Sequence, residues 1–76
     1  MIDLNEVMLH VNNYVQNYDS NIGLQLISQK DSGLEIEVLI FDYEKFLGLS
    51  EIAKLIKKAL KPYNLTLLSL KLKNKP

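Results

Sequence analysis

The acidic residues and the single histidine are the first side chains to consider for chemistry. Glu6 precedes His10 by four residues, and Glu35 and Glu37 are two residues apart. A four-residue spacing on a helix, or a two-residue spacing on a strand, places both side chains on one face. For Glu6 and His10, catalysis would need a third convergent group, and none can be assigned. For Glu35 and Glu37, the alternation of side chains in a hairpin explains the spacing without chemistry. We therefore expect no catalytic residue and no enzyme.

The composition excludes several classes of site. The chain has no cysteine, so disulfides, cysteine-ligated zinc, iron–sulfur clusters and thiol catalysis are excluded. One histidine leaves no His-rich metal site. No glycine-rich phosphate loop or nucleophile elbow is present. We therefore expect neither a metal nor a cofactor.

The lysines of the second half suggest one candidate partner surface. The stretch SEIAKLIKKALKP, residues 50–62, places four lysines on one face of an amphipathic helix: Lys54, Lys57, Lys58 and Lys61. Such a face could neutralise nucleic-acid phosphates. The helix dipole also favours cations near a helix C-terminus, which explains the same lysines without a ligand. The chain has no arginine, the usual bidentate phosphate and base ligand, and this favours the second interpretation.

The charges are unevenly distributed although the net charge is zero. Residues 1–49 hold eight acidic residues and two lysines, whereas residues 50–76 hold seven lysines and one acidic residue. These two parts carry net charges of −6 and +6. If the fold keeps them on different faces, the resulting dipole would orient a partner.

The first element that must position these side chains is a helix that follows Asp3. Asp3 is a suitable N-cap, and Glu6 stands where its side chain completes a capping box. Ile2 and Val7 occupy the positions of a hydrophobic staple. The sequence DSN at residues 19–21 is expected to end the helix.

A hairpin is predicted after this helix, because apolar residues alternate with others at residues 22–27 and 34–41. Asp31, Ser32 and Gly33 suit a three-residue loop in which Gly33 takes the left-handed conformation.

The second half predicts a short helical turn, a helix and a strand. Asp42 is expected to begin the turn and Gly48 to end it. Ser50 is the predicted cap of the main helix, and Pro62 ends it. In the last strand, residues 64–73, three leucines are predicted to share one face: Leu68, Leu70 and Leu72.

The predicted fold class is therefore α+β, a single domain with the order α-β-β-(short α)-α-β. A three-stranded antiparallel or mixed sheet, with two helices packed on one face, would bury every apolar stripe. The last strand can lie beside the first or the second. Residues 1–73 are the expected ordered core, and residues 74–76 are an expected frayed tail.

The element order resembles the type II KH domain, which binds single-stranded RNA or DNA through a GxxG loop between consecutive helices. The matching stretch here is FLGLSEI, in which Gly48 is present, while Ser50 and Glu51 replace the second glycine and its basic neighbours. The same order is similar to that of ring-building modules of secretion and sporulation machines, which assemble head to tail. Both resemblances cover the order of elements, and neither includes a signature motif.

The sheet face away from the helices is the candidate partner surface. Alternation along the strands is expected to turn four apolar side chains outward: Ile27, Leu39, Phe41 and Leu67. An apolar patch on an open sheet face suits contact with another protein. We therefore expect a small protein–protein interaction or self-assembly module, with a protein partner or a second copy. The alternative is a KH-like nucleic-acid-binding domain that uses the lysine face.

No apolar run reaches the roughly 18 residues of a membrane span. The opening MIDLNEVM also lacks the basic region of a signal peptide, so we expect a cytoplasmic protein. The arginine-free, asparagine- and lysine-rich composition is typical of AT-rich bacterial, phage or mobile-element genomes.

Overall fold

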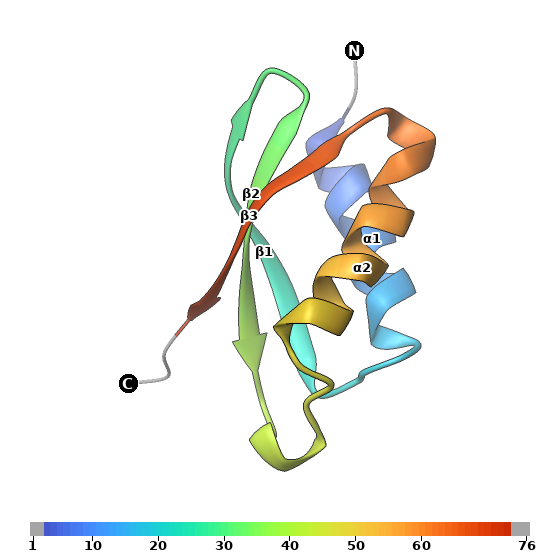
Figure 1. The fold of residues 1–76 in the computed structure, drawn as a ribbon. Helices are drawn as coiled ribbons and strands as arrows, with labels where there is room; N and C mark the ends of the chain where they lie inside the picture. Colours follow the sequence, from blue (N-terminus) through green and yellow to red (C-terminus); the bar gives the residue numbers. More distant parts are fainter. Residues whose placement is uncertain (1–2, 74–76) are drawn as a thin grey trace.

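Two helices cover one face of a three-stranded sheet in the computed structural model, which describes residues 3–73 (Figure 1). The elements are α1 (Leu4–Gln16), β1 (Ile22–Lys30), β2 (Gly33–Ile40), the 3-10 turn η1 (Tyr43–Lys45), α2 (Leu49–Leu60), the 3-10 turn η2 (Lys61–Tyr63) and β3 (Thr66–Lys73). The predicted single α+β domain is confirmed. The predicted contact between Ile2 and Val7 and the predicted frayed tail lie outside the described residues.

The sheet is mixed, which decides between the two predicted arrangements. Its strand order is β1-β2-β3. Strands β1 and β2 are antiparallel, and β2 and β3 are parallel. The connection from β2 to β3 contains α2, which carries the chain back along the sheet so that β3 runs in the direction of β2. The last strand therefore lies beside the second and forms one edge of the sheet.

The two helices begin in different ways. At α1, the Asn5 backbone N–H donates to Asp3 Oδ1 at 2.9 Å, so the predicted cap is confirmed. Helix α2 begins at Leu49, so Ser50 lies inside the helix, and the prediction that Ser50 is its cap is wrong. The residue before α2 is Gly48, whose φ of 102° is accessible chiefly to glycine. This conformation turns the chain into the helix two residues before Ser50 could cap it.

The turn η1 is shorter than predicted. Asp42 begins it as expected, and its Oδ1 accepts a hydrogen bond from the Glu44 N–H at 3.0 Å. The turn ends at Lys45 and does not reach Gly48. Phe46 takes an extended conformation and packs against the core, which ends the helical path.

The hairpin between β1 and β2 has a two-residue turn, so the prediction of a three-residue loop is wrong. Lys30 pairs with Gly33, and Asp31 takes the left-handed conformation with φ of 53°. Gly33 is a strand residue, and a Cβ atom there would overlap the Leu68 side chain. Glycine at this position therefore allows the close approach of Leu68.

A bulge in β3 changes which leucines face the core. Leu67 pairs with Leu34 and Ser69 pairs with Glu35, which leaves Leu68 without a partner residue on β2. Such an extra residue shifts the alternation of side chains along the strand. Leu67 consequently packs against the core, while Leu68 is 52% exposed. The predictions that Leu67 faces outward and that Leu68 shares the inner face are both wrong for this reason.

The core lies between the sheet and the two helices. Among the described residues, the buried apolar side chains come from both helices, from β1 and β2, and from Leu65 just before β3: Val7, Met8, Val11, Val15, Ile22, Leu24, Leu34, Ile36, Val38, Ile40, Ile52, Ile56, Ala59, Leu60 and Leu65. Burying one large aliphatic side chain contributes about 1.5–3 kcal/mol. The helices bury apolar side chains on one face of the sheet only. No described helix covers the other face (Figure 1).

Candidate functional site

The uncovered face, here called the outer face, is built mainly on β2. Residues of β2 alternate between the buried core and half-exposed outer positions. Glu35, Glu37 and Leu39 occupy those outer positions. The chain leaves the strand at Phe41. The same alternation places the Phe41 side chain on the outer face, two residues after Leu39.

Phe41 and Leu39 lie together at one end of the outer face. Phe41 is 53% exposed, and a Cβ atom on Gly23 would lie 3.5 Å from its ring. Gly23 is also the β1 residue that pairs with Leu39. The Phe41 N–H donates to the Asn21 carbonyl oxygen at 2.6 Å. The aromatic ring thus lies over Gly23, and the backbone bond holds the Phe41 backbone in position.

The other two members of the predicted patch are elsewhere. Ile27 is the extra residue of a bulge, because Leu26 pairs with Ile36 and Ser28 pairs with Glu35. Its side chain is 44% exposed. Leu67 belongs to the opposite face, as described above. The structure therefore brings together two of the four predicted residues, and bulges in the edge strands separate the others.

The middle of the outer face is polar. Glu35 accepts hydrogen bonds from Ser28 Oγ at 2.5 Å and from Ser69 Oγ at 3.1 Å, so one carboxylate links all three strands. These two hydrogen bonds, the Ser28 bond first, hold the pKa of Glu35 below its usual value. Glu37 lies 3.9 Å from Lys73 Nζ in an ion pair. Cross-strand partners thus account for both carboxylates of the predicted pair.

The connection from β2 to α2 presents three large exposed apolar side chains: Phe41, Tyr43 and Leu47. Asp19, only 3% exposed, holds this connection in place. Its Oδ2 accepts from the Leu47 N–H at 3.2 Å, and its Oδ1 accepts from the Asn21 N–H at 2.9 Å. The sequence does not predict this role, because an aspartate after a helix signals only that the helix ends. We call the segment of residues 41–47 the apolar connection.

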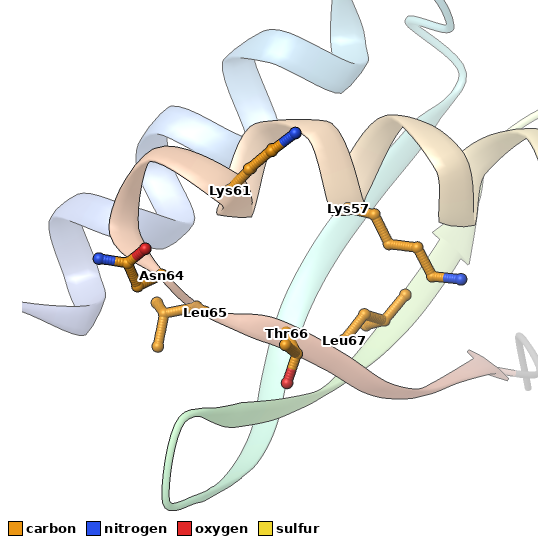
Figure 2. A pocket seen from close by; sticks show the side chains of 6 residues that line it. All are labelled: Lys57, Lys61, Asn64, Leu65, Thr66 and Leu67. Atoms are coloured by element: carbon orange, nitrogen blue, oxygen red, sulfur yellow. The ribbon is translucent and has the colours of Figure 1, made fainter.

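The structure divides the four predicted lysines into two groups. Lys54 forms an exposed ion pair with Glu51 at 3.5 Å, an interaction that contributes little to stability. Lys57 and Lys61 line a pocket of about 470 Å³, and Lys58 does not. The other residues of this pocket are Asn64, Leu65, Thr66 and Leu67 (Figure 2). The lysine face is therefore a helix surface of which one side borders a groove.

His10 and Glu6 do not form a pair. The His10 ring contacts the Tyr63 ring edge to face, with the ring centroids 5.6 Å apart. Within residues 3–73, no group of three or more histidine, cysteine, aspartate or glutamate side chains could hold a metal ion.

The stretch FLGLSEI also differs from the KH arrangement. The element before Gly48 is the three-residue turn η1, so the described chain has one α-helix where that domain has two.

Neither helix in the described part of the chain has the length and apolar character that a membrane span requires. No protein-family model, curated protein or solved structure matches this chain.

Proposed function

We propose that this protein is a small non-catalytic module that binds another protein through the apolar connection and the adjacent end of the outer face. The observation that carries the proposal is the exposed Phe41 ring, held on a fixed backbone at the end of an uncovered sheet face. Aromatic residues, phenylalanine included, are enriched in protein interfaces, where a few buried anchor side chains carry most of the binding energy.

The rigidity of the connection supports this function. Asp19 ties Leu47 to the end of α1, and the Asn21 carbonyl oxygen accepts from the Phe41 N–H. A surface that is already ordered loses little conformational entropy when a partner binds. The Phe41 backbone is therefore ordered before a partner binds, which lowers the entropic cost of using this residue as a contact.

The charges around the connection favour a basic partner surface. Asp42, Glu44 and Lys45 lie within the apolar connection, which therefore carries a net charge of −1. Lys57 and Lys58 lie in the last turn of α2, at the opposite end of a helix that is about 18 Å long at 1.5 Å per residue. A second copy of the chain offers such a basic surface, so we take self-association as the first form of the proposal to test.

Light scattering coupled to size-exclusion chromatography tests the proposal. We expect the molar mass of the protein to rise above that of a monomer as its concentration approaches roughly 1 mM, the range of weak association. Phe41→Asp should restore the monomer, because it places a charge within the apolar contact. Leu9→Asp is the matched control, since Leu9 is exposed on α1, away from the connection.

An oligomer that Leu9→Asp dissociates and Phe41→Asp leaves intact would contradict the proposed surface. A monomer at every concentration would exclude a second copy as the partner. In that case, the test is a pull-down in which the wild-type protein and Phe41→Asp are the baits. Equal capture of partner proteins by both baits would refute binding through Phe41.

A further inference from the structure

The two edges of the sheet differ in how their backbone groups are used. On β1, the Leu24 N–H donates to Asn12 Oδ1 at 2.9 Å, and Asn12 Nδ2 donates to the Leu24 carbonyl oxygen at 3.0 Å. Gln16 Nε2 donates to the Ile22 carbonyl oxygen at 2.9 Å. Side chains of α1 thus make the bonds that a further strand would make, and they protect this edge.

The edge formed by β3 has no such protection in residues 3–73, where no side chain bonds to the β3 backbone. The Thr66 N–H donates toward β2, to the Ser32 carbonyl oxygen at 2.9 Å. Backbone groups alternate in direction along a strand, so the N–H and carbonyl of Leu67 point away from β2, toward the open edge of the sheet. An extended segment could pair with β3 there.

The pocket of about 470 Å³ lies beside this edge. Figure 2 shows Lys57 and Lys61 on its helical wall and residues 64–67 on the facing wall. Leu67 is half-buried and supplies apolar surface at the strand. The groove therefore combines an open strand edge, an apolar wall and two cations.

The two lysines are free to bind a carboxylate. In residues 3–73, the ion pairs join Lys54 to Glu51 and Lys73 to Glu37, so neither pocket lysine has an acidic partner. Residues four apart on a helix are about 6 Å apart. Side chains two apart on a strand are about 6.6 Å apart on one face. Two carboxylates separated by one residue therefore match the lysine spacing.

We propose that β3 accepts an extended acidic segment of a partner protein as a fourth strand. Two carboxylates of that segment, one residue apart, contact Lys57 and Lys61, and an apolar side chain on the same face contacts Leu67. Addition of a strand to an open sheet edge is a common mode of peptide recognition. Pairing of β3 with β3 of a second copy is unfavourable, because both strands carry Lys71 and Lys73. This inference goes beyond the proposed contact at Phe41, since it uses another surface.

A peptide titration tests the inference. The probe is the acetylated and amidated peptide TVTETET, whose valine and two glutamates share one face when it is extended. The control peptide is TVTKTKT. Isothermal titration calorimetry gives the affinity, and amide NMR shifts of the labelled protein give the site. We expect TVTETET to bind with its largest shifts at residues 57–67, and TVTKTKT not to bind.

Charge reversal supplies the matched variants. Lys57→Glu with Lys61→Glu should weaken TVTETET binding by about tenfold or more, because it removes both contacts. Lys54→Glu with Lys58→Glu changes the net charge equally on the same helix, and should leave the affinity within about threefold. Amide spectra confirm that both variants fold.

Several results would overturn the inference. These are no binding of TVTETET, equal weakening by the two double variants, or shifts centred on β1 or Phe41. Tighter binding of a ten-nucleotide oligothymidylate by the same two lysines would assign the groove to nucleic acid instead. Phe41→Asp should leave the peptide affinity unchanged. The peptide titration can therefore fail while association through Phe41 holds, and the reverse is also possible.

Discussion

On the outer face, polar side chains link neighbouring strands to one another. Glu35 shows this most clearly, since its two oxygens accept from serines on both neighbouring strands. The sequence placed Glu35 and Glu37 on one strand face, as the structure has them. It could not assign their partners, because Ser28 and Ser69 reach Glu35 only through the bulges that shift each edge strand by one residue.

Glu35 should make stability depend on pH in the acidic range. Its folded-state pKa is lowered, chiefly by Ser28 and then by Ser69. The stabilisation is therefore present above the unfolded-state pKa and is lost as the pH falls through the folded-state pKa. Urea unfolding across this range should show a smaller acid-induced loss for Glu35→Gln than for the wild type.

The double variant Ser28→Ala with Ser69→Ala is the control for the cause of this shift. NMR titration of the Glu35 carboxyl should show its pKa rising toward the usual value in that variant. An unchanged pKa would show that the serine hydroxyls are not responsible.

A second residue-scale prediction concerns the contact between Gly33 and Leu68. Gly33→Ala should lower the free energy of unfolding by about 1 kcal/mol, because its Cβ atom would displace the Leu68 side chain. In a Leu68→Ala background the same substitution should be neutral or slightly stabilising, since the overlap is gone. Thermal or urea unfolding of the four proteins measures this coupling. Additive effects of the two substitutions would contradict the steric explanation.

At the scale of elements, α1 protects one sheet edge and α2 does not protect the other. Asn12 and Gln16 of α1 bond to the β1 backbone, whereas Lys57 and Lys61 stand beside the edge of β3. Helical periodicity alone places Asn12 and Gln16 on the polar side of an amphipathic helix. Their role depends on the position of β1 beside α1, which periodicity along one helix cannot show.

Asn12→Ala should therefore be destabilising although Asn12 is a polar helix residue. We expect a loss of about 1–2 kcal/mol, because both backbone groups of Leu24 lose their partner. Asn13→Ala is the control, since Asn13 is exposed on the same helix, and should change stability by less than about 0.5 kcal/mol. Urea unfolding compares the two, and similar losses would refute protection of the edge by Asn12.

At the scale of the whole molecule, the sheet order turns an uneven charge distribution along the chain into one across the sheet. Helix α1 packs on β1 at one edge, and α2 packs on β3 at the other (Figure 1). The basic part of the chain, residues 50–76, therefore includes the unprotected edge. This arrangement is the common basis of both proposals, because it sets the basic pocket beside β3 apart from the apolar connection.

The sequence by itself determined the element order, the α+β class and most of the core, because periodic burial and the caps at Asp3 and Asp42 are local properties. The tertiary structure alone decided that β3 lies beside β2, that Leu67 faces the core, and that Asp19 holds the apolar connection. Sheet order depends on how a helical crossover packs. A bulge reverses the alternation of side chains along a strand, so the residues predicted to face outward change beyond it. For that reason the sequence identified Phe41 and the lysines as candidate contacts, but only the fold showed which lysines border a groove.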